Sequence, residues 1–161
     1  MTVFMKEKDS FSYAFDNYAD TVYRVAFHNT ENSADAEDIT QEAFLRLLKT
    51  PKIFKDSEHI KAWLIRVTIN LCHDHFRKAG TAKLTEETVE DKGVSDVNPV
   101  LEAVKALPEN YRNAIYLHYY EGYTAKEIGR ILEAKENTVL SWLSRGRAAL
   151  REEMIGGFDD E

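Results

Sequence analysis

A narrow stripe of basic, aromatic and amide side chains in residues 57–78 has the chemistry of a nucleic-acid contact. Its six members follow one another at intervals of three or four residues: His59, Trp63, Arg66, Asn70, His73 and Arg77. On an α-helix this spacing confines them to an arc of about 80°. The cations can contact phosphates, the indole ring can stack on a base, and the amide can read a base edge.

The same stripe is also compatible with an ordinary solvated face of an amphipathic helix. The remaining arc is apolar and predicts a largely buried helix, with Ile60, Leu64, Ile65, Val67, Ile69, Leu71, Cys72 and Phe76 on it. Trp63 favours the nucleic-acid alternative, because an exposed tryptophan on the surface of a monomer usually marks an interaction site.

Residues 124–151 contain a second DNA-binding pattern. Thr124 and Glu127 form a capping box that predicts a short helix, and residues 133–135 form a tight connection to the next one. The second helix has one apolar face, made of Val139, Leu143, Gly146 and Leu150. Its other side is polar and basic, with Asn137, Thr138, Ser141, Trp142, Arg145, Arg147 and Arg151. This arrangement is typical of a helix-turn-helix, whose second helix enters the major groove. The alternative is an ordinary helical hairpin whose arginines complement the helix dipole.

A third surface is acidic. The helix predicted over residues 33–48 carries a face opposite its apolar side, made of Asp35, Asp38, Gln41, Glu42 and Leu45. Carboxylates repel phosphates, so an acidic face with an exposed leucine fits a protein partner better than nucleic acid. A solvated face is the alternative explanation.

Catalysis is disfavoured by the residue patterns. His73 and His75 flank Asp74, but side chains two residues apart on a helix diverge by about 200°, so the two imidazoles cannot share a metal ion. The sequence has one cysteine, Cys72, and lacks a Gly-rich phosphate loop or a nucleophile elbow. We therefore predict neither an enzyme nor a cofactor site.

Composition is compatible with a helical DNA-binding protein despite the net charge of −7. Residues 100–151 carry 8 basic and 6 acidic side chains, whereas residues 152–161 carry 5 acidic side chains and no basic one. The negative charge is thus concentrated away from the predicted DNA-binding surfaces. The apolar segments are too short to span a bilayer, and residues 1–6 lack a signal-peptide pattern. A cytoplasmic protein without membrane insertion is expected.

The elements that position these side chains are predicted to be helices only. Phe11, Phe15, Tyr18, Val22 and Ala26 have helical spacing. Ser33 is the predicted N-cap of the next helix, which buries Ala36, Ile39, Ala43, Leu47 and Leu48. A loop from Pro51 to Glu58 leads to the stripe helix. Helical spacing resumes at residue 100, and Pro108 opens a helix that Gly122 ends.

The fold class is therefore all-α, with two helical domains joined by a flexible linker. The predicted boundaries are residues 1–78 for a domain of three or four helices, 79–99 for an acidic linker, 100–152 for the helix-turn-helix domain, and 153–161 for a frayed acidic tail.

The sequence resembles the ECF-type sigma factors of bacterial RNA polymerase. Three motifs carry the resemblance in the order found in that family: residues 35–44 (DAEDITQEAF), residues 62–70 (AWLIRVTIN) with Asp74 to Arg77, and Leu107-Pro108 with Thr138-Val139 and Arg145-Gly146-Arg147. The resemblance covers nearly the whole chain. It implies a transcription initiation factor with a region 2 domain, a short linker and a region 4 domain.

This resemblance also implies partners and a role for each surface. Region 2 would bind the β′ clamp of core polymerase and the −10 promoter element, and region 4 would bind the β flap and the −35 element. An anti-sigma factor would be a further partner. The acidic surface then contacts polymerase through Asp35, Asp38, Gln41, Glu42 and Leu45.

The promoter contacts are likewise implied by the resemblance. The loop from Lys52 to Glu58 would capture a flipped base of the −10 element against the cost of unstacking, with Phe54 and Lys55 as the candidates. The other candidates for the −10 element are His59, Lys61, Trp63, Arg66, Asn70, His73, Arg77 and Lys78. The candidates for the −35 element are Lys135, Glu136, Asn137, Thr138, Ser141, Trp142, Arg145 and Arg147.

Three positions depart from the family pattern. Leu140 and Trp142 stand where basic residues are usual, and Lys135 stands where a capping serine is common. These departures favour van der Waals contact with thymine methyls and sugars over guanidinium readout. The second hypothesis for the whole chain is a stand-alone helix-turn-helix regulator that binds duplex DNA as a dimer, and a catalytic helical protein is the third.

Overall fold

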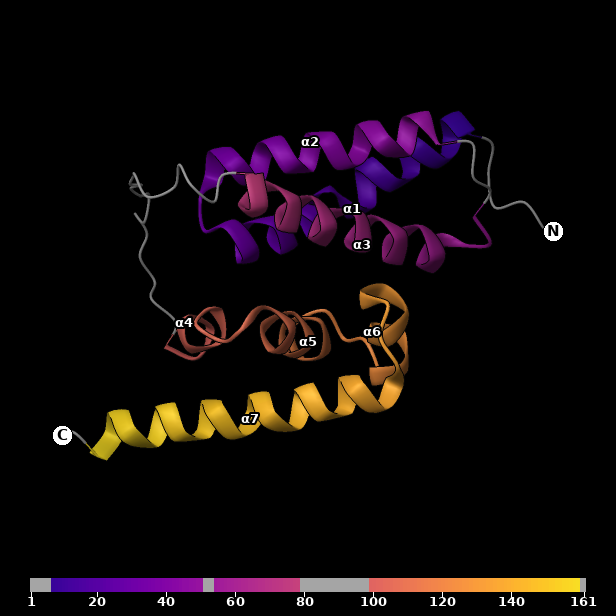
Figure 1. Ribbon diagram of the computed structural model, residues 1–161. Helices are drawn as coiled ribbons and strands as arrows, with labels where there is room; N and C mark the ends of the chain where they lie inside the picture. The colour runs from indigo at the N-terminus through magenta and orange to yellow at the C-terminus, as the bar shows by residue number, and fades with distance from the viewer. Residues whose placement is uncertain (1–6, 51–53, 79–98, 160–161) are drawn as a thin grey trace. The chain divides into compact units, whose positions relative to one another are not determined.

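A computed structural model describes residues 7–50, 54–78 and 99–159, and these residues form helices and turns with no strand among them. The helices are α1 (Glu7–Thr30), α2 (Ser33–Lys49), α3 (Ser57–Lys78), α4 (Pro99–Lys105), α5 (Glu109–Tyr119), α6 (Ala125–Leu132) and α7 (Glu136–Asp159) (Figure 1). The all-α prediction is confirmed. Contacts divide the chain into two compact units, Met1–Gly93 and Val94–Glu161, which we call unit 1 and unit 2.

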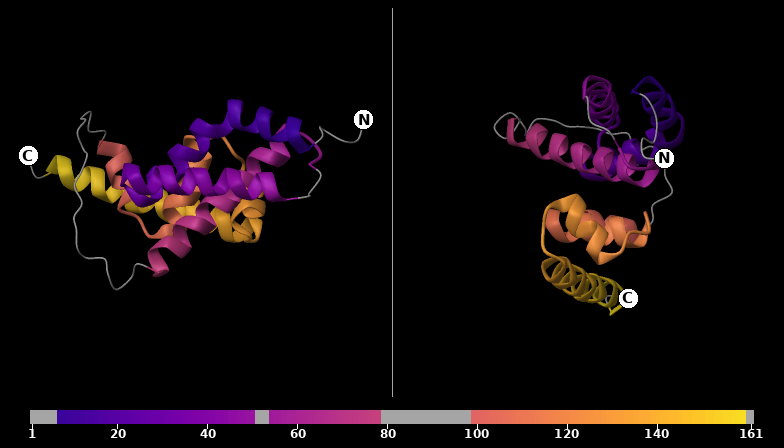
Figure 2. Two further views of the ribbon diagram at one scale, coloured as in Figure 1. Left: turned by 90° about the horizontal axis from the view of Figure 1, so that it is seen from above. Right: turned by 90° about the vertical axis from the view of Figure 1, so that its right-hand side faces the viewer.

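Unit 1 is a three-helix domain. α1 and α2 form an antiparallel hairpin, and α3 packs against both (Figures 1 and 2). Their turn places Glu31 in the left-handed region at φ 56°, and Asn32 is the N-cap of α2. The core is apolar and draws on all three helices: Ala14, Val22, Ala43, Phe44, Leu47, Phe54, Ile60 and Leu64. Thr68 is fully buried, but its hydroxyl donates to the Leu64 carbonyl 2.7 Å away, which satisfies it.

Unit 2 packs three helices around α7. α4, α5 and α6 all contact α7, and the buried face of α7 contains Val139, Leu143 and Gly146. Gly146 is required for this packing, because a Cβ there would lie 2.9 Å from Cγ1 of Ile115 on α5. The predicted capping box is present, since Thr124 and Glu127 exchange hydrogen bonds between side chain and backbone.

Four details of the predicted elements were wrong. Asn32, not Ser33, caps α2, because the Asn32 side chain accepts from the Asp35 N–H. Leu48 is 52% exposed, since it follows Leu47 around the helix by about 100° and points away from the core. Phe76 is 49% exposed in the last turn of α3.

The fourth error is the C-terminal tail. α7 continues to Asp159 through most of the stretch predicted to fray. The reason lies in residues 148–154, which are mostly strong helix formers and precede the two glycines. The predicted linker at residues 79–99 lies outside the described residues, except for Pro99, which opens α4. Pro51, Lys52 and Ile53 of the predicted loop also lie outside them.

Candidate nucleic-acid interfaces

The N-terminal end of α3 is organised by Asp56. Its side chain accepts a hydrogen bond from the backbone N–H of His59 at 2.9 Å, which caps the helix. Nδ1 of His59 in turn accepts from the backbone N–H of Lys55 at 3.1 Å, so in this arrangement the ring proton resides on Nε2. The sequence analysis missed this pair of hydrogen bonds, although an Asp one residue before a helix is a recognisable capping signal.

Phe54 lies beneath an aromatic cluster rather than on the surface. Its ring is 4% exposed and packs edge-on against His59 at 5.1 Å and Trp63 at 5.7 Å between centroids. Trp63 is itself half-buried, so the exposed indole predicted from the sequence is only partly accessible. Phe54 and Trp63 contribute to the core of unit 1, because Phe54 packs against the first turns of α3.

The C-terminal half of the stripe is accessible. Asn70, His73, Arg77 and Lys78 are exposed, and Arg66 is half-buried. Arg77 forms an ion pair with Asp74 at 3.0 Å, three residues earlier on the same helix. Such an exposed pair contributes at most about 1 kcal/mol, so a phosphate can compete for the guanidinium.

Lys61 lies apart from the stripe. Its ammonium group sits over the ring of Tyr18 on α1, 6.0 Å from the centroid, which is a cation–π geometry. Burial raises the pKa of the Tyr18 hydroxyl, against an opposing hydrogen bond with Ser57. The structure therefore uses Lys61 to join α3 to α1, a role that the helical spacing alone did not reveal.

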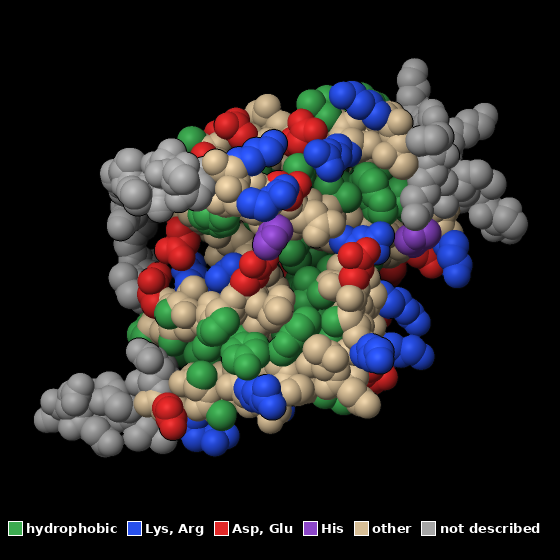
Figure 3. Space-filling view, viewed as in Figure 1, with side chains coloured by type: hydrophobic (Ala, Val, Ile, Leu, Met, Phe, Trp, Pro, Cys, Tyr) green, Lys and Arg blue, Asp and Glu red, His purple; other side chains and the backbone are tan. Residues whose placement is uncertain are grey.

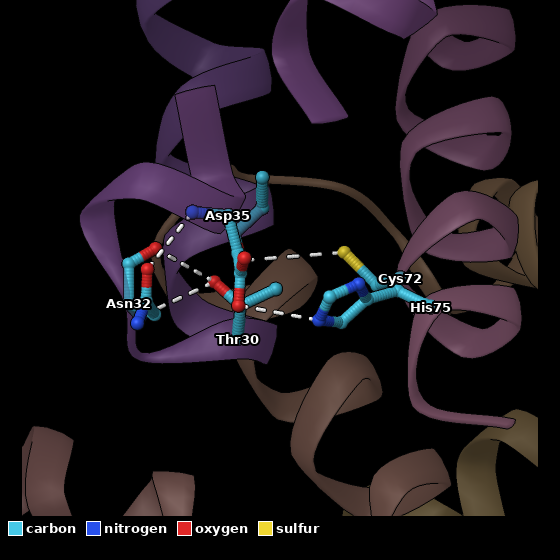
Figure 4. A network of polar contacts seen from close by, with 6 residues as sticks. Thr30, Asn32, Asp35, Cys72 and His75 are labelled. Atoms are coloured by element: carbon cyan, nitrogen blue, oxygen red, sulfur yellow. Dashed lines mark hydrogen bonds and ion pairs between the residues drawn. The ribbon is translucent and has the colours of Figure 1, made fainter. Parts of the chain in front are cut away.

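Two carboxylates of the acidic face of α2 have side-chain partners. Oδ2 of Asp35 lies 3.2 Å from Nε2 of His75 on α3, beside the buried thiol of Cys72 (Figure 4). Glu42 pairs with Arg46 at 3.2 Å. Asp38, Gln41 and Leu45 are exposed. A protein contact centred on these three side chains therefore requires little rearrangement of the helix.

In unit 2 the turn between α6 and α7 is tight. Glu133 adopts a left-handed conformation at φ 59°, and its N–H and that of Ala134 both point to the Gly129 carbonyl. A Cβ on Gly129 would lie 2.6 Å from the Ala134 carbonyl oxygen, so only glycine fits there. Lys135 accepts the first bond of α7 through its backbone, whereas its side chain has no acceptor to cap the helix.

The exposed side of α7 carries most of the predicted −35 contacts. Glu136, Asn137, Arg145 and Arg147 are exposed, as is Lys135 just before the helix, whereas Thr138, Ser141 and Trp142 are half-buried. Figure 3 shows blue basic and red acidic side chains interspersed on the visible surface of each unit.

Tyr119 is a residue that the sequence analysis did not single out. Nη1 of Arg147 donates to its hydroxyl at 3.2 Å, which links α7 to the end of α5. The Tyr119 ring packs edge-on against His118, whose Nδ1 lies 2.8 Å from the Tyr123 carbonyl. Arg147 is thus held by a side chain 28 positions away, a pairing with no signal in local spacing.

Two other classes of site have no candidate among the described residues. Among the described residues, no group of three or more His, Cys, Asp or Glu side chains is placed to hold a metal ion. Within the same part of the chain, no helix combines the length and hydropathy needed to cross a bilayer.

Comparison with known families places both units. The model for sigma-70 region 2 matches residues 14–81, and the model for sigma-70 region 4 matches residues 98–150. The ECF RNA polymerase sigma factor SigW of Bacillus subtilis is 32% identical, and the alignment covers 92% of this chain and 90% of SigW. The ECF sigma factor SigE of Mycolicibacterium smegmatis is 34% identical over 84% of this chain, but this chain spans 58% of its length.

A solved structure has the same fold. The sigma factor RpoE of Bartonella quintana, crystallised with the anti-sigma factor NepR, aligns with a TM-score of 0.75 at 22% identity. That alignment covers 88% of this chain and 94% of RpoE.

Proposed function

The chain belongs to the ECF sigma factors of bacterial RNA polymerase, and from this premise we propose how its residues divide the work of promoter recognition. As a member of that family it is a transcription initiation factor, not an enzyme: it binds core polymerase and directs it to promoters. The observation that supports our division is that each unit carries its own candidate DNA-binding helix, α3 in one and α7 in the other.

Core polymerase binds the exposed face of α2. Asp38, Gln41 and Leu45 form its centre, with Glu42 and Asp35 at its edge, and the β′ clamp is the partner. An acidic surface with an exposed leucine supports this assignment. Its carboxylates attract a partner of opposite charge, and the leucine supplies apolar contact area.

The −10 element binds the exposed half of the α3 stripe. Asn70 reads a base edge, and Arg66, His73, Arg77 and Lys78 contact the DNA strand. His59, Lys55 and Trp63 border this surface. We leave Phe54 and Lys61 out of the base contacts, because the first is buried and the second packs on Tyr18.

The −35 element binds α7 as duplex. Its N-terminal residues face the base edges, and Arg145 and Arg147 contact the backbone. Residues 79–99 connect the two DNA-binding units, and the β flap contacts unit 2. RpoE, which has the same fold, was solved with an anti-sigma factor, which supports a regulator of that kind for this chain. The site of action is the cytoplasm, where the polymerase is.

The second hypothesis, a stand-alone helix-turn-helix regulator, is not favoured. Such a regulator needs a ligand pocket or a dimer interface in its other domain. Unit 1 matches sigma-70 region 2 instead, and the relative SigW matches along 90% of its own length.

The test is a pull-down of core polymerase with charge-reversed chains. Asp38→Arg combined with Glu42→Arg should abolish binding, because like charges that face each other across an interface cost several kcal/mol. Asp16→Arg combined with Asp20→Arg is the matched control: the same charge change at the same spacing on exposed positions of α1. Circular dichroism should be unchanged in both. Equal retention of polymerase by the two variants would refute the assignment.

A further inference from the structure

Leu140 is a large apolar side chain exposed on the candidate recognition helix. Its relative exposure is 47%, whereas Val139 beside it is fully buried. At about 100° per residue, Leu140 lies inside the arc that also holds the exposed residues Asn137 and Ser144. It is therefore part of the face presented to a partner, not a core residue at the edge of the packing.

The surroundings of Leu140 leave its methyl groups accessible. Asn137 and Ser144, roughly one turn before and after it, and the adjacent Ser141 carry short polar side chains. Glu136 lies four residues earlier, in the first turn of α7, where its carboxylate complements the helix dipole. Trp142 is half-buried on the other flank of the helix and is less accessible than Leu140.

The major groove offers one apolar group to such a side chain. Guanine, cytosine and adenine present only hydrogen-bond donors and acceptors there, whereas thymine also presents its C5 methyl. From the exposure and position of Leu140, we infer that it reads a thymine methyl in the −35 element and thereby determines specificity at one base pair. This inference rests on the proposed function, because it requires α7 to enter the major groove.

The experiment uses holoenzyme reconstituted from core polymerase and the full chain. A promoter selected from a random library is synthesised with each −35 thymine replaced in turn by deoxyuridine, which removes only the methyl. Wild-type holoenzyme should bind about fourfold more weakly at one position, the loss expected for one buried methyl group. Holoenzyme with Leu140→Ala should bind the thymine promoter more weakly and should no longer distinguish thymine from deoxyuridine at that position.

Two further variants provide the controls. Leu140→Met keeps an apolar side chain and should keep the discrimination. Ser144→Ala alters the same exposed face without removing the leucine and should also keep it.

The outcomes are distinct. If every deoxyuridine promoter binds like its thymine parent while the −35 element is still required, the inference is wrong and the proposed function stands. The inference is also wrong if Leu140→Ala weakens capture of core polymerase without DNA, since Leu140 would then contact protein. If wild-type chain does not bind core polymerase, the proposed function fails and the inference with it.

Discussion

At the scale of single residues, substitution of Asn70 tests the promoter contact. Its amide is exposed and contributes nothing to the core, so an effect on promoter binding would not come from lost stability. We expect Asn70→Ala to leave the melting temperature unchanged and to lower discrimination at one position of the −10 element by about 1–3 kcal/mol. Open-complex formation on a panel of −10 variants measures this. If the promoter preference of the variant is unchanged from that of wild type, the stripe is only a solvated helix face.

Arg77 should differ from Asn70 in kind. A lost phosphate contact weakens binding to all sequences, so Arg77→Ala should reduce the salt dependence of promoter binding by about one unit of slope. Asp74→Ala is the control, since it removes the ion pair with Arg77 but keeps the cation. A salt slope altered equally by both substitutions would indicate that the ion pair, not the phosphate, is what Arg77 serves.

The Tyr119 hydroxyl accepts a hydrogen bond from Arg147, so we expect Tyr119 to affect DNA binding through the position of that guanidinium. Tyr119→Phe removes only the hydroxyl that Arg147 donates to. Because a single exposed hydrogen bond contributes about 0.5–1.5 kcal/mol, we expect DNA affinity to fall by that order while the melting temperature changes little. Tyr120→Phe, at the neighbouring exposed tyrosine, is the matched control. The double variant Tyr119→Phe, Arg147→Ala should bind DNA no more weakly than Arg147→Ala alone.

In long helices, the spacing of residues predicted which side chains are exposed. The exposed Asn70, His73 and Arg77 were predicted from spacing alone. Periodicity gave no face for Phe54, because it precedes α3 and is buried by tertiary packing against Trp63. The Arg147–Tyr119 bond likewise joins residues far apart in sequence, and no single-sequence pattern carries that information.

At the scale of elements, the turn between α6 and α7 depends on Gly129. Alanine is favoured over glycine in a helix by about 1 kcal/mol. Here its Cβ would approach the Ala134 carbonyl to 2.6 Å, and a backbone oxygen cannot rotate away. Overpacking of this kind costs about 1–3 kcal/mol, so we expect Gly129→Ala to destabilise unit 2 despite the higher helix propensity of alanine. Urea unfolding measures the change, and the exposed Lys126→Ala on the same helix should show none. A more stable Gly129→Ala chain would show that the turn can widen at little cost.

Helix types and order were predictable, and helix ends less so. The capping box at Thr124 fixed the start of α6, because both of its hydrogen bonds are local. The end of α7 differs from the prediction, since the helix formers before the two glycines carry the helix through them. A helix end could therefore be predicted from local sequence only where a nearby side chain bonds the unpaired backbone groups at that end.

At the scale of the whole molecule, each unit has its own buried core. Leu64 is fully buried in unit 1, and Leu117 is fully buried in unit 2. Cutting either side chain to alanine should cost about 2–5 kcal/mol, because it removes apolar contacts and leaves a cavity. If the units unfold independently, calorimetry of the free chain should show two transitions. Leu64→Ala should lower only one of them, and Leu117→Ala only the other. A single transition shifted by both substitutions would mean that the two units unfold as one cooperative body. Independent units would let α3 and α7 adjust separately to the two promoter elements. Core polymerase, which binds both units in the proposed function, would then set the distance between α3 and α7.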